Sequence, residues 1–232
     1  FSKAICQSGG MNAYVDRNRA NAWGGLFLQK ADEFGISVDA LQSCSANQIT
    51  SIAKNIKPMM IAEKKWLSPE IGFAPVADGN FLPLNPLENF IGSPIKLIVG
   101  TNSDEYRLWS EFEPYFLNLT EEQFIKRLKK MFHQDRISKI QEHYLDQNLE
   151  NDKYKNALSN IMTDWTFGMH ALELLENHKH QSFGYLFSEA SPLFAGRLGA
   201  YHASELPYLF GSWQKKPFKR LCSKNASITS EI

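Results

Sequence analysis

The stretch Lys96-Leu97-Ile98-Val99-Gly100-Thr101 is the clearest strand signal in the sequence. It is a continuous apolar run rather than an alternating one, which is typical of a strand in a parallel sheet that is covered on both faces. Two further short apolar runs, at residues 4–7 and 184–187, predict buried strands earlier and later in the chain. Each of the three runs leads into polar residues, so each predicted strand ends in a loop that can carry chemistry.

Segments with helical spacing of apolar residues separate the predicted strands. Thr120 and Gln123 form a capping box at the start of one helix, and Gly35 and Gly211 stand where two others are expected to end. The expected helices are residues 16–34, 38–44, 46–56, 86–90, 120–132, 136–144, 154–165, 167–177 and 204–210. This alternation of strands and helices predicts an α/β fold with a parallel sheet.

The sheet is expected to continue beyond this sequence. Three strands are few for 232 residues, and the first residue is Phe1, placed almost directly before an expected core strand. We therefore expect the natural N-terminus, and further strands, to lie upstream.

Composition excludes several classes of partner. Hydrophobic residues make up 43% and charged residues 22%, as in ordinary globular domains, and 25 basic residues balance 25 acidic ones. Without a basic stripe, we expect no nucleic-acid partner. No apolar run approaches the ~20 residues of a membrane span. Cys6, Cys44 and Cys222 form no motif, and their odd number favours a reduced, cytoplasmic location.

Polar residues with catalytic potential follow the three predicted strands in order. Ser8 follows the first strand, Glu105 the second and His202 the third. Ligands of open parallel sheets bind at the carboxyl ends of the strands, so a carboxylate and an imidazole could meet there. A histidine oriented by a buried carboxylate can take a proton from a serine hydroxyl, and the order acid then histidine matches hydrolases of this architecture. From spacing alone, a solvated loop glutamate and a hydrogen-bonded loop histidine remain open alternatives.

Other candidate residues carry simpler interpretations. No carboxylate or cysteine set completes a metal site around the remaining histidines, which we expect on the surface: His133, His143, His170, His178 and His180. Trp109 and Phe112 follow the acid strand and either pack in the core or line a pocket for the acyl or alcohol group. The basic residues at 126–130 indicate a solvated helix face.

Four segments together resemble the type-B carboxylesterases, the group of cholinesterases and para-nitrobenzyl esterase. Residues 1–10 (FSKAICQSGG) resemble the segment after the nucleophile elbow, and residues 73–79 (FAPVADG) resemble the central loop. Residues 100–105 (GTNSDE) resemble the turn that carries the acid, and residues 199–211 (GAYHASELPYLFG) the histidine segment. The four lie in the family's order across nearly the whole chain. Tyr106-Arg107-Leu108-Trp109 resembles bacterial members more than animal cholinesterases.

This resemblance implies an α/β-hydrolase fold, with residues 1–232 as the C-terminal part of a single domain. It assigns Glu105 as the triad acid and His202 as the base, and it makes Ser8 a serine whose hydroxyl bonds the acid. Asp164 matches, more loosely, a structural aspartate, and Glu205 a residue of the histidine motif with local polar bonding. The implied substrate is a small carboxylic ester, and no cofactor or metal is implied.

The departures from the family concern the nucleophile. No Gly-x-Ser-x-Gly pattern occurs in the sequence, and Gly24-Gly25 lies in a predicted helix rather than in an oxyanion loop. We expect the missing N-terminal half of the fold to supply both, so the chain alone is predicted to be inactive. Two alternatives stay open: a non-catalytic cholinesterase-like interaction or adhesion protein, and a relic of a split gene.

Overall fold

The computed structural model describes residues 1–9, 14–62, 74–145 and 152–223, without the side chains of residues 57–62. The chain forms two compact units, one of Phe1–Met11 with Phe90–Ile232 and the other of Asn12–Asn89. The first unit contains the sheet and every element that carries Ser8, Glu105 or His202.

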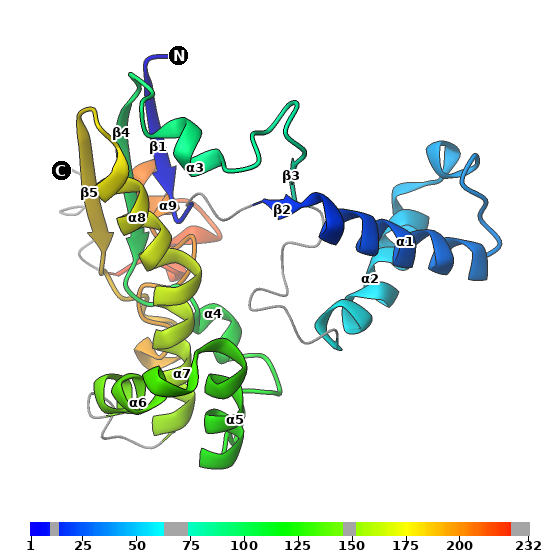
Figure 1. The fold of residues 1–232 in the computed structure, drawn as a ribbon. Helices are drawn as coiled ribbons and strands as arrows, with labels where there is room; N and C mark the ends of the chain where they lie inside the picture. Colours follow the sequence, from blue (N-terminus) through cyan, green and yellow to red (C-terminus); the bar gives the residue numbers. More distant parts are fainter. Residues whose placement is uncertain (10–13, 63–73, 146–151, 224–232) are drawn as a thin grey trace. The chain divides into compact units, whose positions relative to one another are not determined.

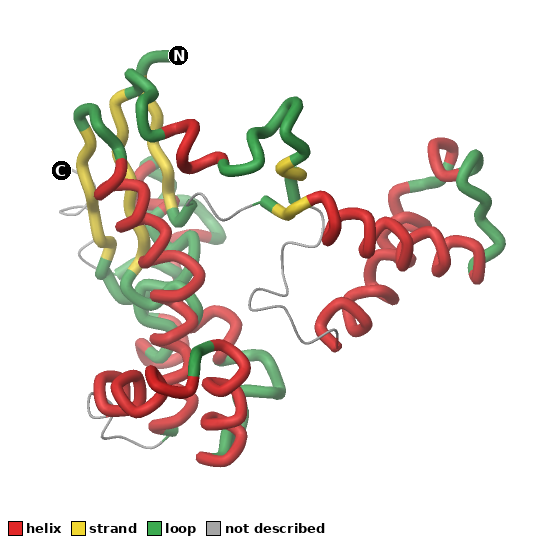
Figure 2. The backbone as a smooth tube through the Cα atoms, viewed as in Figure 1, coloured by secondary structure: helices red, strands yellow, loops and turns green. Residues whose placement is uncertain are grey.

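The sheet of the first unit consists of parallel strands in the order β1-β4-β5. The strands are β1 (Lys3–Gln7), β4 (Lys96–Asn102) and β5 (Ser182–Phe187), and β4 lies between the other two (Figures 1 and 2). The predicted strands, their parallel pairing and the α/β class are thereby confirmed. Because the strands are parallel, the residues that follow β4 and the segment that follows β5 leave the sheet at the same edge.

One face of this sheet is covered by helix α8 (Met169–Asn177), which runs alongside the strands in Figure 1. A Cβ added at Gly184 would lie 3.0 Å from Leu175 Cδ1, so this helix packs directly on the strand backbone. Leu97 and Val99 point to the same face and are buried.

The other face is open over its first half. Residues paired in parallel strands point to the same side, and Ile5 and Phe183 both pair with Ile98. Ile5 is 60% exposed, Ile98 39% and Phe183 56%. The prediction that these strands are covered on both faces is therefore wrong for this chain, because its described residues leave these apolar side chains uncovered.

Of the remaining helices of the first unit, α4 (Arg107–Ser110), α5 (Glu121–Met131) and α6 (Ile137–Leu145) pack against α7 (Lys153–Thr163). Helix α9 (Leu206–Leu209) instead contributes Tyr208 to a separate cluster with Cys222. Helix α5 begins with the predicted capping box and buries Phe124 and Leu128, four residues apart on one face. A π-helical turn, Asp164–Gly168, joins α7 directly to α8. The segment predicted as helix 204–210 is α-helical only over α9.

The second unit contains α1 (Arg17–Glu33), α2 (Ala46–Ala62) and two short parallel strands, β2 (Val15–Asp16) and β3 (Val76–Ala77). Asp16 caps α1 by accepting a hydrogen bond from Arg19 N at 2.8 Å. Val15, Trp23 and Ile56 form the core.

The predicted helix at residues 38–44 is wrong. It is a single 3₁₀ turn, Leu41–Ser43, in which no residue is buried. Without an apolar face to bury, so short a segment has nothing to offset the cost of nucleating a helix. The short helix α3 (Pro86–Phe90) is present as predicted.

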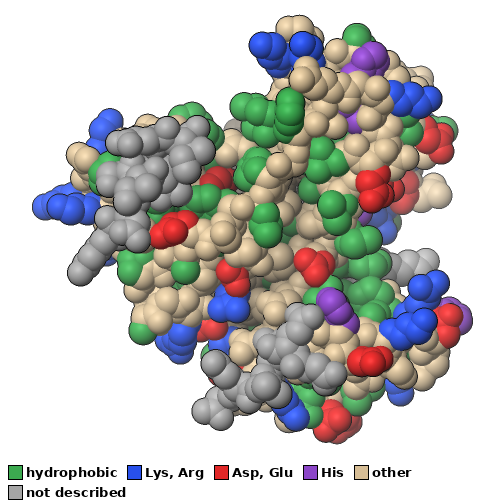
Figure 3. Space-filling model, turned by 90° about the vertical axis from the view of Figure 1, so that its left-hand side faces the viewer, with side chains coloured by type: hydrophobic (Ala, Val, Ile, Leu, Met, Phe, Trp, Pro, Cys, Tyr) green, Lys and Arg blue, Asp and Glu red, His purple; other side chains and the backbone are tan. Residues whose placement is uncertain are grey.

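No helix among the described residues combines the length and the apolar character that a membrane crossing requires. On the face drawn in Figure 3, acidic and basic side chains are interspersed, in keeping with the balance of 25 basic and 25 acidic residues.

The close packing of β5 on β4 gives a first prediction. A methyl group at Gly100 would lie 2.2 Å from Tyr185 Cδ1, so Gly100→Ala should destabilise the chain by about 1–3 kcal/mol through overpacking. Urea unfolding measures the effect. Gly92→Ala is the matched control, because no atom lies within 4 Å of the added Cβ there. Equal stability of the two variants would contradict this account of the β4–β5 contact.

Candidate active site

Glu105 lies in the turn after β4 and is fully buried, with an exposed fraction of 0%. Its Oε1 atom accepts a hydrogen bond from Asn102 N at 2.8 Å and another from the hydroxyl of Ser8. Its Oε2 atom lies 2.7 Å from His202 Nδ1. The three residues that follow β1, β4 and β5 in the sequence thus meet at one carboxylate.

Ser8 reaches this carboxylate because of its position directly after β1. Its backbone N–H donates to Gly100 O at 2.8 Å, which extends the β1–β4 pairing by one residue. Its φ of 52° then turns the chain out of the strand direction. The hydroxyl of Ser8 donates a hydrogen bond to the Glu105 carboxylate.

The imidazole of His202 is flanked by two aromatic rings. Its ring centroid lies 5.3 Å from that of Trp109 and 5.1 Å from that of Phe167, and these two rings are stacked on each other with an interplanar angle of 15°. Trp109 comes from α4 and Phe167 from the π-helical turn. The apolar rings restrict the orientations that the imidazole can adopt.

The two aromatic residues predicted to line a pocket therefore have different surroundings. Trp109 contacts the candidate base, whereas Phe112 makes an edge contact with Phe194 and is 54% exposed. Phe167 was not predicted from the sequence, because the segment 167–177 was expected to be an ordinary helix and contains no strand end. A π-helical turn is often found at functional sites, but the sequence gives no direct signal for it.

Asn102 connects the acid turn to the histidine segment from within the core. Its side-chain amide donates to Tyr201 O at 2.8 Å and to Glu205 Oε2 at 2.7 Å. Asn102 and Glu205 are both buried. Burial raises the pKa of Tyr185, and the Glu205 carboxylate raises it further. Glu205 thus takes part in a buried polar network beside the acid–histidine pair.

Asp164 is the first residue of the π-helical turn. It accepts a hydrogen bond from Tyr144 Oη at 2.5 Å and thereby ties α6 to the π-helical turn that carries Phe167. Burial of Tyr144, with the bond to Asp164 in addition, raises the pKa of the phenol well above its usual range.

The predicted surface position of His178 is wrong. The residue is only 7% exposed, its Nε2 lies 2.7 Å from Ile95 O, and its ring stacks on Phe90. It packs here because the chain turns inward after α8 and brings the ring against the segment that leads into β4. The other four are exposed or half-buried: His133, His143, His170 and His180. The described residues contain no group of three potential ligands for a metal ion.

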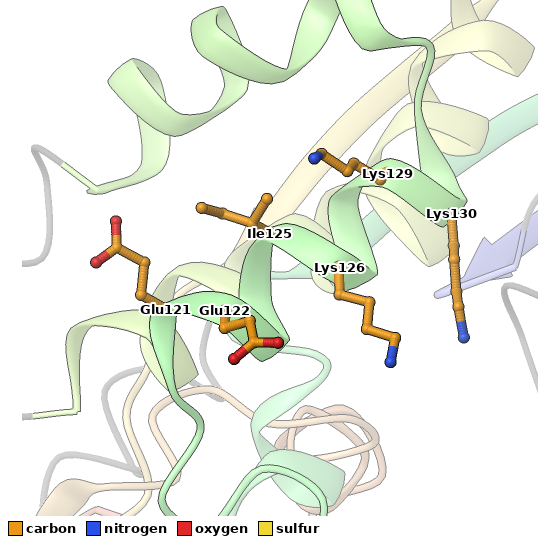
Figure 4. Close-up of a pocket in the computed structure, with 6 residues that line it drawn as sticks. All are labelled: Glu121, Glu122, Ile125, Lys126, Lys129 and Lys130. Carbon is orange, nitrogen blue, oxygen red and sulfur yellow. The ribbon is translucent and has the colours of Figure 1, made fainter.

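A hollow on the outer side of α5 is a different kind of feature (Figure 4). Its described lining comes from this one helix: Glu121, Glu122, Ile125, Lys126, Lys129 and Lys130. The charged side chains project from the helix, in agreement with the solvated basic face that the sequence predicted. The hollow contains neither Glu105 nor His202, so it is separate from the acid–histidine site.

Chemically, the arrangement pairs an imidazole with a buried carboxylate. A carboxylate at Nδ1 holds the imidazole in the tautomer whose Nε2 can accept a proton, and it stabilises the imidazolium that results. A parallel sheet that brings an acid and a histidine together beyond two adjacent strands is the arrangement of the α/β-hydrolases. This chain belongs to the carboxylesterase family, whose model matches residues 1–229.

Several curated proteins are similar to this chain in sequence. Para-nitrobenzyl esterase of Bacillus subtilis is 26% identical over 236 aligned residues, which cover 100% of this chain and 45% of that protein. Phenmedipham hydrolase of Pseudarthrobacter oxydans is 28% identical over 153 residues, 64% of this chain and 30% of that protein. Human bile salt-activated lipase is 26% identical and is matched over 22% of its length. The chain spans less than half the length of these relatives.

Solved structures agree on the fold. A carboxylesterase of Geobacillus stearothermophilus superimposes with a TM-score of 0.73 at 22% identity, covering 97% of this chain and 45% of that one. A para-nitrobenzyl esterase structure gives a TM-score of 0.69, covering 100% of this chain and 46% of that one. The chain therefore has the fold of one portion of an α/β-hydrolase.

The network around Asn102 predicts a stability effect. Asn102→Leu would leave Tyr201 O and the buried Glu205 carboxylate without this donor, at a cost of about 1–3 kcal/mol for each group. Urea unfolding measures the loss. Asn89→Leu is the matched control, because the Asn89 amide is exposed and donates to Asn85 O, in the residue just before α3. A loss no larger than that of the control would show that the network is unimportant.

Tyr144 predicts a dependence of stability on pH. Because its pKa is raised in the folded state, the neutral phenol stabilises the fold below about pH 10 and this contribution is lost as the pH rises through the raised value. Tyr144→Phe should therefore cost about 1 kcal/mol or less at neutral pH, since Asp164 is exposed. The difference from wild type should shrink above about pH 10. Unfolding series at several pH values test this, and a difference that grows with pH would contradict it.

Proposed function

We propose that this chain supplies the acid and the base of a Ser-Glu-His triad in a carboxylic ester hydrolase. The observation that carries the proposal is the contact of 2.7 Å between His202 Nδ1 and Oε2 of the fully buried Glu105. A buried carboxylate on an imidazole at the carboxyl edge of a parallel sheet fits proton transfer in acyl-transfer chemistry. Membership of the carboxylesterase family supports this reaction class.

In the proposed reaction, a serine outside this sequence attacks the ester carbonyl while its proton passes to His202 Nε2. The imidazolium then gives the proton to the departing alkoxide, which leaves as the alcohol, and an acyl-serine remains. Water, deprotonated by His202, releases the acid in the second half of the reaction. Glu105 stabilises the imidazolium in both halves without itself taking the proton.

The surroundings of Glu105 support its role as an anion. Ser8 and Asn102 donate to Oε1, and His202 lies at Oε2, so hydrogen-bond donors engage both oxygens of the carboxylate. A carboxylate that accepts several such bonds has a fixed orientation. We assign Ser8 and Asn102 to positioning the acid, and Glu205 and Asp164 to supporting the histidine segment and the π-helical turn.

The substrate of the proposed enzyme is a small carboxylic ester. Trp109 lies against the imidazole, so we assign it to line the space where an acyl or alcohol group would lie. Phe112, in the turn after α4, is a second candidate for this lining and packs edge-on against Phe194. Mostly apolar walls with a few convergent polar groups are typical of such sites.

The proposed partner is the N-terminal part of the same fold. The exposed apolar face at Ile5, Ile98 and Phe183 is of the kind that further elements of a sheet protein cover. Strand β1 lies at the edge of the described sheet, where another strand can pair. The relatives, of which this chain matches less than half, support the same conclusion. We propose that residues 1–232 form the C-terminal part of one such domain.

A fluorophosphonate label on the native protein tests the proposal, because it reports chain length and a reactive serine in one intact-mass measurement.

In a polypeptide that joins this chain to a Gly-x-Ser-x-Gly region, His202→Ala should lower kcat by about a millionfold. Changing Glu105 to Gln should lower it by about ten-thousandfold. The 232-residue chain alone should hydrolyse no p-nitrophenyl ester above background.

The controls are His133→Ala and Glu142→Gln, which change the same residue types at exposed positions. They should leave turnover within about twofold of wild type. An active-site-titratable rate from the isolated chain, or full activity in the His202→Ala variant, would overturn the proposal.

A further inference from the structure

Asp104, next to the acid, makes an unusually complete set of contacts for a turn residue. Its Oδ2 atom accepts hydrogen bonds from Ala200 N at 3.0 Å and from Ser103 Oγ at 2.8 Å. Its Oδ1 atom forms an ion pair with Arg107 Nε at 2.9 Å. The side chain is thus fixed from both sides and is held against the segment that carries His202.

The backbone of Asp104 also bonds to Ala200. Asp104 N donates to Ala200 O at 3.1 Å, so one residue engages both the N–H and the C=O of Ala200. Two further hydrogen bonds join the same segments: Asn102 Nδ2 donates to Tyr201 O at 2.8 Å, and His202 N donates to Glu105 O at 3.3 Å. Ala200 is therefore the residue of this segment that Asp104 holds at both its N–H and its C=O.

Gly199 allows this close approach. A Cβ at this position would lie 2.4 Å from Asp104 Oδ2 and 2.5 Å from Asp104 Cγ, and the φ of Gly199 is +57°. Both the space and the backbone conformation suit glycine. Any other side chain would displace the carboxylate that anchors Ala200.

The loop before Ala200 contains strained backbone. Phe194 and Ala195 both have φ values in the left-handed region, 51° and 57°, which is unfavourable for residues with a side chain. Such a conformation persists only where surrounding contacts fix it. Arg107 provides one further contact, from Nη1 to Arg197 O at 3.3 Å.

We propose that Asp104 is a positioning residue that sets the distance between His202 and Glu105 by fixing Ala200. Asp104 lies one residue before the acid, and Ala200 lies two residues before the base. The hydrogen bonds between Asp104 and Ala200 therefore tie the two catalytic segments to each other. Small errors in such a distance are costly in catalysis. Only the catalytic consequence rests on the proposed function, because the position of the imidazole can be measured in the chain itself.

The experiment measures the tautomer of His202 by nitrogen-15 NMR of the full 232-residue chain, at about pH 8 where imidazoles are neutral. Bonding to Glu105 favours the Nδ1–H form, whereas an imidazole in water favours Nε2–H. Asp104→Ala should lower the ratio of Nδ1–H to Nε2–H by about fivefold or more, as expected when a hydrogen bond to a charged group is weakened. Gly199→Ala should produce the same loss.

The Asp104→Asn variant distinguishes the effect of the hydrogen bond to Ala200 from the effect of the negative charge of Asp104. The amide oxygen can still accept from Ala200 N while the negative charge is removed, so the ratio should change by less than about twofold. Equal losses in the Asn and Ala variants would mean that charge alone acts, and would overturn the proposal. Asp135→Ala removes an exposed carboxylate that pairs with His133 and should have no effect.

Two outcomes distinguish this inference from the proposed function. If Glu105→Ala lowers the ratio and neither Asp104→Ala nor Gly199→Ala does, only the positioning role fails. If Glu105→Ala itself leaves the tautomer unchanged, the acid–histidine pair does not exist in solution, and both proposals fall. Should Asp104→Ala not fold, Gly199→Ala and Asp104→Asn still give the comparison.

Discussion

The site depends on one buried carboxylate. Glu105 has no exposed surface, and an unpaired charge in that position would be strongly destabilising. Its donors come from three separate places in the sequence: Ser8 after β1, Asn102 at the end of β4, and His202 beyond β5. Two of these donors, Ser8 and His202, come from beyond the neighbouring strands, so the full set of contacts at the carboxylate requires β1 and β5 to pair with β4 in register.

Much of this could be predicted from local sequence. The apolar run at residues 96–101 predicts a parallel strand, and this strand is the central one of the described sheet although one of its faces is partly exposed. The polar residues after each strand indicate where the acid and the histidine lie. The capping box at Thr120 fixes the start of α5, because it depends on two side chains and one turn. Each of these features depends on residues that are close to one another in the sequence.

Features that depend on distant packing were not predictable in the same way. The burial of His178 depends on the path of the chain after α8, and the exposure of Ile5 depends on what the rest of the fold places over it. Phe167 reaches the imidazole through a π-helical turn, which has no compositional signature. The role of Asp104 follows from the close approach of Gly199, and only the folded chain brings these two residues together.

The π-helical turn adds one residue between the helices on either side of it. Because Asp164–Gly168 joins α7 to α8 without a break, the two helices behave as one rod with an additional residue in its middle. A π-helical turn accommodates one additional residue within nearly the same rotation, so α8 leaves it in about the register that an uninterrupted α-helix would give. Removing one residue there would close the turn into ordinary α-helix and leave Leu175 over the strand backbone that it covers. The additional residue therefore serves the direction of the Phe167 ring toward the imidazole and not the packing of α8 on the sheet.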